Sequence, residues 1–337
     1  MAALRGGVPR RRGARPGRPE RRQPARAHAP GTRHPGAARP RPAAHGARRG
    51  DLGAGLVRAG GGLRPGVAAL HRHPHRRRLA AARPEDVELG RHAVPGPLAE
   101  TVAAAALLEA LPDPGPAEEW LPRVAEGRAL LGLADPEGGH ALDADAADGV
   151  LLVSGDRLLL AREHGPPLAS LDPVRRLARP RQDTAAVLAT GPAVVAAAAR
   201  AADRATLVTA AQALGVGLAL LARTVEHVRR RHQFGVPVGS FQAVKHRLAD
   251  TLIALEFARP LLHGAAVTGT GADVAAAKAA CGEAAYRAAR TALQLHGALG
   301  YTAEYDLSLW LTKARALRSA WGTPARCRAR VLAETPR

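Results

Sequence analysis

Residues 193–250 read AVVAAAARAADRATLVTAAQALGVGLALLARTVEHVRRRHQFGVPVGSFQAVKHRLAD, and this stretch decides the fold. Its first part, residues 193–231, is rich in Ala and Leu and contains no Pro, which predicts one long helix that tolerates two glycines. The sequence FGVPVGS (234–240) then interrupts the helix, because Pro and Gly break helical structure. Ser240 is a good N-cap for a second helix. Two long helices joined by a short turn indicate a helical bundle.

The predicted second helix carries apolar side chains at spacings of 3, 4, 4 and 3 residues. This spacing places them on one face of a helix, and we expect that face to lie against the bundle. The residues are Phe241, Val244, Leu248, Leu252 and Leu255. Helices over 272–296 and 307–320 complete the prediction of an up-and-down four-helix bundle, and a short basic helix ends the chain.

Upstream of this bundle the periodicity of the sequence changes. LAETVAAAALLEAL (98–111) and residues 117–126 predict two helices. Between residues 129 and 191 short apolar runs alternate with turn residues, and VLLVSGDRLLLA (150–161) predicts a β-hairpin around Gly155. The fold class is therefore α+β and mostly α, with the helices and a small sheet in separate blocks.

The first 83 residues differ from the rest of the chain. They hold 21 Arg, two acidic residues and no Lys or aromatic residue, whereas residues 84–337 hold 28 basic and 27 acidic residues. Pro and Gly recur too often for a helix or strand, so we predict a disordered segment. An Arg-rich tail that binds nucleic acid is one alternative, but no aromatic side chain is present on which bases could stack. The other is a frameshifted start of a GC-rich gene, in which Arg, Pro, Gly and Ala replace real helices.

Composition also limits the class of protein. Cys281 and Cys327 have no CxxC spacing, so we expect neither a disulfide framework nor a metal site. Free cysteines fit a reducing compartment, and the Arg-rich amino terminus lacks the apolar region of a secretory signal. No run reaches 18 apolar residues, so we expect no membrane span and a cytoplasmic protein.

Two segments resemble turns of the acyl-CoA dehydrogenase family. RRRHQFGVPVGSFQAVKHRLAD (229–250) is similar to the family pattern R-x-x-F-G-x-x-(I/V)-x-x-x-Q, and LQLHGALGYTAEYDLSLW (293–310) is similar to Q-x-x-G-G-x-G-Y. The two segments occur in the family's order. ELGRHAVPGPLAET (88–101) also looks like part of the family's N-terminal helical domain. The resemblance covers roughly residues 85–335.

The resemblance assigns a domain to each block of the chain. Residues 1–83 precede it, residues 84–128 are the remnant of the N-terminal helical domain, residues 129–191 form a small β domain, and residues 192–337 form the C-terminal helical bundle. It implies FAD as the cofactor, an acyl-CoA thioester as the substrate and α,β-desaturation as the reaction.

In the family, FAD lies extended across a subunit interface, and these two turns hold it. By resemblance Arg231 bonds the pyrophosphate, which suits a guanidinium. The residues alone leave simpler interpretations open: Arg231 as a helix C-terminal cap, and Gly297 with Gly300 as an ordinary C-cap turn. The expected cofactor-binding residues are Arg231, Gln233, Phe234, Gln242, Gln294, Gly297, Gly300 and Thr323.

The family's catalytic Glu is missing at both positions where its subfamilies carry it. One position immediately precedes a Gly-Thr pair, and the matching sequence ALRSAWGTPARCR (316–328) has Trp321 there. The other lies on the helix before the Arg-Phe-Gly turn and corresponds to Ala205. Asp203 is about 200° around that helix from Ala205, so we expect it to face elsewhere. Removal of the α-proton requires a carboxylate, so we expect the chain to lack its own base.

The β-rich block also departs from the family, since ALLGLADPEGGHALDADAAD (129–148) replaces its T-E-x-x-x-G-S-D-like loop. These departures imply the partner-dependent kind of acyl-CoA dehydrogenase, known from bacterial steroid side-chain degradation, in which two unlike subunits share a flavin site and one supplies the Glu. The expected partners are an acyl-CoA substrate and a second acyl-CoA dehydrogenase subunit, in a homo- or hetero-oligomer, and neither a membrane nor nucleic acid. One alternative is a self-sufficient enzyme whose base is Glu304 or Asp306, and another is a flavin-free, non-enzymatic or degraded homologue. We expect no catalytic role for His296.

Overall fold

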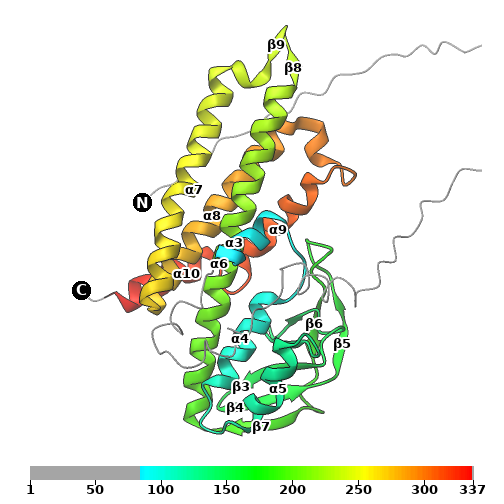
Figure 1. Ribbon diagram of the computed structural model, residues 1–337, viewed down its shortest axis with the longest axis vertical. Helices are drawn as coiled ribbons and strands as arrows, with labels where there is room; N and C mark the ends of the chain where they lie inside the picture. Colours follow the sequence, from blue (N-terminus) through cyan, green and yellow to red (C-terminus); the bar gives the residue numbers. More distant parts are fainter. Residues whose placement is uncertain (1–83, 336–337) are drawn as a thin grey trace, which may run out of the picture. The chain divides into compact units, whose positions relative to one another are not determined.

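The computed structural model describes residues 84–335. Helices dominate this part of the chain, and a small block of strands lies beside one end of the longest helix (Figure 1). The predicted α+β, mostly helical fold class is confirmed. The predictions made for residues 1–83 lie outside the described residues.

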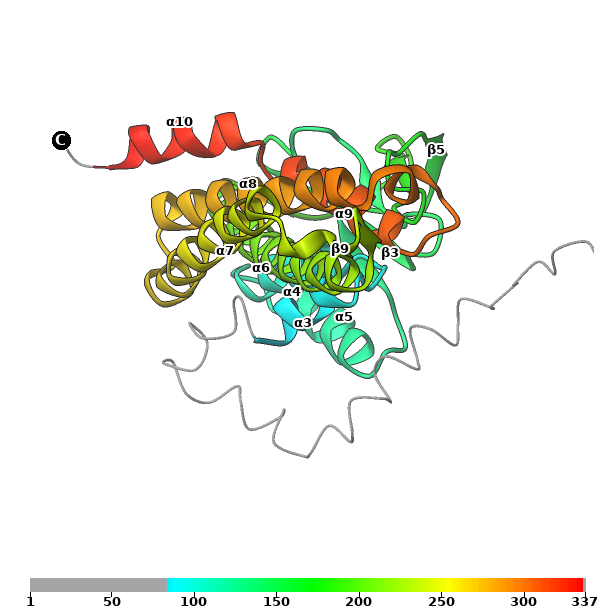
Figure 2. The same ribbon diagram turned by 90° about the horizontal axis from the view of Figure 1, so that it is seen from above.

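The helices follow one another in chain order, with two short 3-10 turns among them. They are α3 (Pro84–Arg91), α4 (Leu98–Glu109), α5 (Gly115–Ala125), α6 (Pro192–Arg230), η2 (Val238–Ser240), α7 (Gln242–Thr268), α8 (Gly271–His296), η3 (Gly297–Tyr301), α9 (Leu307–Ser319) and α10 (Pro324–Glu334). α6 packs against α3, α4, α7, α8 and α9, and α8 against α7, α9 and α10. Figure 2 shows α6, α7 and α8 side by side when seen from above.

The strands between α5 and α6 form two small sheets. They are β1 (Leu131–Leu133), β2 (Ala141–Leu142), β3 (Gly149–Ser154), β4 (Arg157–Ala161), β5 (His164–Leu168), β6 (Leu177–Pro180) and β7 (Ala186–Thr190). One sheet has the order β1-β3-β4-β7 and the other β2-β6-β5. β3 and β4 form the predicted hairpin, with Ser154 opposite Arg157 and Gly155 at φ = 62°, a left-handed conformation that glycine adopts without strain.

α3 crosses α6 with the two backbones in contact. A Cβ atom on Gly90 would lie 2.1 Å from the carbonyl oxygen of Gln212, and one on Gly215 would lie 1.9 Å from that of Val87. Only glycine fits such an approach, which explains why the long helix contains Gly215 despite its low helix propensity.

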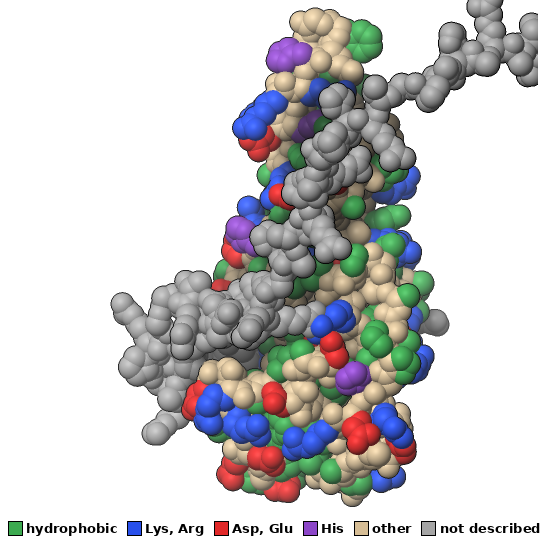
Figure 3. Space-filling view, turned by 90° about the vertical axis from the view of Figure 1, so that its right-hand side faces the viewer, with side chains coloured by type: hydrophobic (Ala, Val, Ile, Leu, Met, Phe, Trp, Pro, Cys, Tyr) green, Lys and Arg blue, Asp and Glu red, His purple; other side chains and the backbone are tan. Residues whose placement is uncertain are grey.

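By length and composition α6 could cross a membrane, with a mean hydropathy of 1.8 over its most apolar window. However, 89% of that window is buried inside the protein, so its composition is that of a core helix. On the face that Figure 3 shows, Lys and Arg side chains of the described residues lie interspersed with Asp and Glu.

The beginning of α7 differs from the prediction. Ser240 is not the N-cap, because it belongs to η2 and its Oγ donates a hydrogen bond to the carbonyl oxygen of Pro237 (2.7 Å). Phe241 takes the N-cap position without a side-chain cap. The chain forms a short hairpin of β8 (His232–Gln233) and β9 (Val236–Pro237). η2 then occupies residues 238–240, so α7 begins one residue later than predicted.

The predicted apolar stripe of α7 is only partly correct. Leu255 is buried, but Leu252 is 45% exposed and Phe241 39% exposed. The face that packs on the bundle instead continues through Ala258 and Leu262. α7 carries apolar residues on two faces, and spacing alone selected members of both.

Candidate functional site

The turn between α9 and α10 carries Trp321. The side chain is 7% exposed, and its backbone is left-handed with φ = 53°. The indole Nε1 donates a hydrogen bond to Glu100 Oε1 (3.1 Å), and the Trp321 carbonyl oxygen accepts one from Thr206 Oγ1 (3.0 Å). Trp321 is therefore fixed by α4 through its side chain and by α6 through its backbone.

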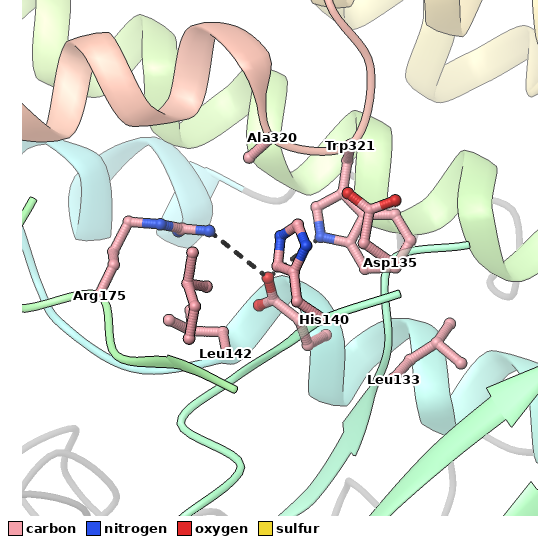
Figure 4. Close-up of a pocket in the computed structure, with 9 residues that line it drawn as sticks. Leu133, Asp135, His140, Leu142, Arg175, Ala320 and Trp321 are labelled. Carbon is pink, nitrogen blue, oxygen red and sulfur yellow. Dashed lines mark hydrogen bonds and ion pairs between the residues drawn. The ribbon is translucent and has the colours of Figure 1, made fainter. Parts of the chain in front are cut away.

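Glu100 projects from α4 into the same interior and is 5% exposed. Arg175 Nη2 lies 3.9 Å from Glu100 Oε1, and dashed lines in Figure 4 mark this ion pair and the bond to the indole. A buried carboxylate is costly unless it is paired and hydrogen-bonded, and Glu100 has both kinds of partner. The three side chains thus form one buried unit.

The space left beside this unit is small. Its lining consists of Glu100, Leu133, Asp135, His140, Leu142, Arg175, Leu177, Ala320 and Trp321 (Figure 4). The cavity volume is about 10 Å³, which is room for roughly one water molecule. Small-molecule sites usually enclose about 300–1,000 Å³. The interior beside Trp321 therefore has no room for an acyl chain or a flavin ring.

Lys313 on α9 is another buried charge close to this unit. It is 6% exposed, and its Nζ donates a hydrogen bond to the carbonyl oxygen of Val94 (2.5 Å). Burial, together with the nearby Arg175, lowers the pKa of Lys313 to about 8, against the opposite effect of the carboxylates of Asp172 and Glu100. Lys313 is thus a buried charge whose hydrogen-bond partner lies within the chain.

The structure brings the two expected positions of the catalytic Glu together. Ala205 on α6 is fully buried and belongs to the same hydrophobic cluster as Trp321. Ala205 also directly precedes Thr206, which bonds the Trp321 carbonyl. Asp203 forms an ion pair with Arg330 on α10. A carboxylate is therefore absent at both positions, and Asp203 is engaged elsewhere.

The alternative bases lie apart from this interior. Glu304 and Asp306 are exposed in the segment between η3 and α9, and neither lines the cavity beside Trp321. Within residues 84–335, no group of three or more His, Cys, Asp or Glu side chains is placed to hold a metal ion.

The turn after α6 lies at the far end of that helix from the β-rich block (Figure 1). Arg231 ends α6, and Gln233 in β8 pairs with Val236 in β9. Phe234 and Gly235 connect the strands with φ of 53° and 79°, as a tight two-residue hairpin turn requires. Phe234 is 91% exposed. The turn thus presents an aromatic ring and the exposed Arg231 and Gln233 side chains outward.

The turn after α8 is formed by η3. Gln294 is exposed on the last turn of α8, and Gly297 caps the helix with φ = 61° and an N–H that donates to Leu293. Gly300 is buried, and a Cβ there would lie 3.1 Å from the Leu293 carbonyl oxygen. The helix-capping interpretation describes the backbone of Gly297, and it leaves the exposed Gln294 amide available to a ligand.

Two histidines join these turns. His227 lies four residues before Arg231, His296 directly precedes Gly297, and their rings stack with centroids 4.1 Å apart. Burial lowers the pKa of both, and the neighbouring His296 and Arg231 lower that of His227 further. Both Nε2 atoms are buried without a hydrogen-bond partner in the described part of the chain. The stack places the two predicted cofactor turns at one end of the bundle.

Two further residues of the expected set fall in different places. Gln242 is exposed at the first residue of α7, next to the turn after α6. Thr323 is the N-cap of α10, and its hydroxyl accepts a hydrogen bond from the Arg326 N–H (3.3 Å). The turn that contains Thr323 contacts Lys278, which precedes Gly297 by about 28 Å along α8. Thr323 therefore lies apart from the two cofactor turns.

Sequence reasoning missed Glu100, Arg175 and Lys278. For two of them a signal was present, since Glu100 and Lys278 each stand among apolar residues, in LAETVAAAALLEAL and in ADVAAAKAAC (272–281). Such a residue is either exposed or buried with a partner, and the helix pattern alone does not distinguish the two. Arg175 lies in a loop that carries no comparable pattern.

Comparison with known proteins agrees with this arrangement. Residues 176–334 match the family model for the C-terminal domain of acyl-CoA dehydrogenases. Acyl-CoA dehydrogenase IpdE2 of Mycobacterium tuberculosis is 37% identical over 231 residues, which cover 67% of this chain and 69% of that protein. IpdE2 of Mycolicibacterium smegmatis is 32% identical over 240 residues, covering 70% and 73%.

Among solved structures, the ChsE4-ChsE5 complex from Mycobacterium tuberculosis matches with a TM-score of 0.65 and 25% identity. The match covers 85% of this chain and 97% of the matched chain. The sequence motifs, the helical fold and the coverage of the IpdE2 relatives agree with one another. The chain belongs to the acyl-CoA dehydrogenase family of oxidoreductases.

Proposed function

We propose that this chain is one subunit of a heteromeric FAD-dependent acyl-CoA dehydrogenase, and that a second, unlike subunit supplies the catalytic carboxylate. The observation that carries the proposal is Trp321. Residue 321 is the position at which the family resemblance predicts the base. Here it holds a buried indole, which is hydrogen-bonded to Glu100 beside a cavity of about 10 Å³. An indole N–H donates a hydrogen bond and cannot accept the α-proton of a substrate.

The reaction requires a positioned carboxylate for the α-proton and hydrogen-bond donors for the thioester oxygen. FAD, when bound, supplies the chemistry that accepts the β-hydrogen as hydride. Glu100 does not meet the first requirement, because Trp321 and Arg175 engage its carboxylate and the adjoining space holds about one water molecule. An acyl thioester cannot reach it.

The chain's contribution to the cofactor is the pair of turns at the end of α6 and α8. Arg231 offers a guanidinium to a pyrophosphate, and Phe234 offers an aromatic face to a base. The residues that fit the group are exposed there: Arg231, Gln233, Phe234, Gln242, Gln294 and Gly297. A single chain leaves these groups uncovered, which fits a ligand held between two subunits.

The partner we propose is a second acyl-CoA dehydrogenase chain that carries the Glu. The similarity to a chain of the ChsE4-ChsE5 complex supports a heteromeric assembly. Cys281 and Cys327 are both free and buried, which fits a reducing, cytoplasmic location. Acyl-CoA would then bind mainly on the partner, where space and base are both available.

Co-expression with an acyl-CoA dehydrogenase chain that carries the Glu tests the proposal. We expect a yellow complex that reduces an artificial electron acceptor with acyl-CoA, while the isolated chain supplied with FAD does not. Activity of the isolated chain would contradict the missing base. A stable complex without flavin would favour the flavin-free homologue instead.

A further inference from the structure

Lys278 lies in the first half of α8 and is 1% exposed. Its Nζ donates hydrogen bonds to three backbone carbonyl oxygens, those of Gly322 (2.9 Å), Leu317 (3.0 Å) and Arg318 (3.2 Å). An ammonium group has three N–H donors, so this arrangement uses its full donor capacity. All three N–H donors of Lys278 therefore bind backbone carbonyls near residue 321.

These carbonyls lie on both sides of the turn between α9 and α10. The last carbonyls of a helix have no donor within the helix, and Lys278 satisfies those of Leu317 and Arg318 near the end of α9. The carbonyl of Gly322 lies beyond residue 321. One ammonium group therefore ties the end of α9 to the far side of the turn, and the backbone between them cannot rotate without breaking one of these bonds.

The turn needs such restraint. Trp321 has φ = 53° and Gly322 has φ = 118°, and the left-handed region is unfavourable for a side chain as bulky as Trp. Conformations of this kind persist only where the surroundings determine them several times over. Thr206 holds the Trp321 carbonyl from α6, Glu100 holds the indole from α4, and Lys278 holds the backbone on either side from α8.

We propose that Lys278 is the positioning residue of this turn, and that it directs whichever side chain stands at residue 321 into the interior between α4 and α6. The inference goes beyond the proposed function, since it needs neither FAD nor a partner. It concerns the position where the family resemblance places the catalytic Glu. In this chain the same restraint keeps an indole in that place.

Lys313 provides a matched control. It is also a buried lysine, it also donates to a backbone carbonyl, and burial lowers the pKa of both lysines to about 8. Its acceptor is Val94, between α3 and α4, and it makes no hydrogen bond to the turn at residues 319–323. Substitution of either lysine removes a buried ammonium, but only one of the two substitutions releases the turn.

The experiment is ¹⁹F NMR of the full chain labelled with 5-fluorotryptophan. The three tryptophans, Trp120, Trp310 and Trp321, give three signals, and Trp321→Phe assigns the one of interest. In Lys278→Met we expect the Trp321 signal to shift or broaden while the Trp120 signal stays in place. In Lys313→Met the Trp321 signal should keep its position. A folded Lys278→Met chain with an unchanged Trp321 signal overturns the proposal.

If Lys278→Met does not fold, a pH titration of a chain that keeps Lys278 provides the test. Around pH 8 Lys278 loses a proton, and the neutral amine has two N–H donors for three carbonyls. The other groups acting on the pKa of Lys278 are Arg318, which lowers it, and Cys281 and Cys327, which raise it. Burial raises the pKa of both thiols, to about 12 for Cys281. The titration uses the Lys313→Met chain, because Lys313 also has a pKa of about 8 and lies close to Glu100, and we expect the Trp321 signal to move with a midpoint near pH 8. A Trp321 signal that stays constant from pH 7 to pH 9 overturns the proposal.

Discussion

The turn at Trp321 and the turns at Arg231 and Gly297 are built in opposite ways. At Trp321 the indole N–H and the carbonyl oxygen both have partners inside the chain, and the remaining space is about 10 Å³. At the other end Phe234 is 91% exposed, and the stacked His227 and His296 leave two buried nitrogens without partners among the described residues. On the proposed function, the exposed groups of this second region are the ones that meet the cofactor.

On the proposed function, this difference shows how a flavin site shared by two subunits would be divided. The half that would hold the base has become part of the hydrophobic core, where each change costs stability. The half that would touch the cofactor has stayed on the surface, where a change costs binding. Substitutions in the two regions should therefore have separate effects, one on stability and the other on cofactor binding.

The largest effect should concern catalysis. In the complex with its partner, replacing the partner's catalytic Glu by Gln should lower the rate of acyl-CoA oxidation by about 10²–10⁴-fold, which is the usual contribution of a general base. Trp321→Phe in this chain should change that rate by less than about threefold, because the indole takes no part in proton transfer. Steady-state rates with one acyl-CoA measure both.

Trp321→Glu should not give the isolated chain activity. The new carboxylate would meet Glu100 in the same interior, and two buried carboxylates close together cannot both ionise. Oxidation of acyl-CoA by the isolated Trp321→Glu chain would show that only the base was missing, and that the cavity can open.

The second prediction compares the same change in the two regions. Trp321→Ala should lower the free energy of unfolding by about 3–5 kcal/mol, since it empties a buried site and strips Glu100 of a hydrogen bond. Phe234→Ala should change it by less than about 0.5 kcal/mol, because the ring is exposed. Urea denaturation followed by circular dichroism measures both. Equal losses would mean that the two turns do not differ as described.

Much of this division could be predicted from the sequence, because it depends on local patterns. The long helix, the hairpin at Gly155 and the Arg-Phe-Gly turn are each formed by one continuous stretch of sequence. The absence of a Glu at Trp321 and Ala205 can be read from a motif alone. The fold class followed from the same patterns and is confirmed.

The contacts that close the site could not be predicted, because they join distant residues. Glu100 and Trp321 are 221 positions apart, and Lys278 meets Gly322 across 44. Helical periodicity places such residues on a face but does not say which helix that face meets. Leu252 shows the same limit within one helix, since its spacing fits the buried stripe and its side chain is 45% exposed.

The third prediction concerns the open region. Arg231→Ala should weaken flavin retention in the complex, and loss of a charge-assisted hydrogen bond to phosphate should cost about 1.5–3 kcal/mol, or roughly 10- to 150-fold in affinity. Arg230→Ala is the matched control, because Arg230 is adjacent and forms an exposed ion pair with Glu226. The ratio of flavin to protein absorbance after gel filtration measures the effect. Flavin retention that is the same in both variants would remove Arg231 from the cofactor site.

The smallest effect should be a pH dependence that belongs to the closed region. Burial lowers the pKa of Lys278 and Lys313 from 10.5 to about 8, so above about pH 8 the unfolded chain binds more protons than the folded one. The free energy of unfolding must therefore rise with pH there, by about 1 kcal/mol per lysine between pH 8 and 9.

Cys281 acts in the opposite direction above pH 9, because burial raises the pKa of its thiol from 9.0 to about 12 and the unfolded chain releases that proton first. We expect stability to increase from pH 8 to 9 and to rise less steeply above pH 9, because the thiol offsets about one of the two lysines. Urea denaturation at fixed ionic strength measures the slope, which should halve in Lys278→Met or Lys313→Met. Arg230→Ala, a change at the open end, should keep the full slope. A slope that survives in the Lys278→Met/Lys313→Met double variant would assign the pH dependence to other groups, and the buried charges around Trp321 would no longer account for it.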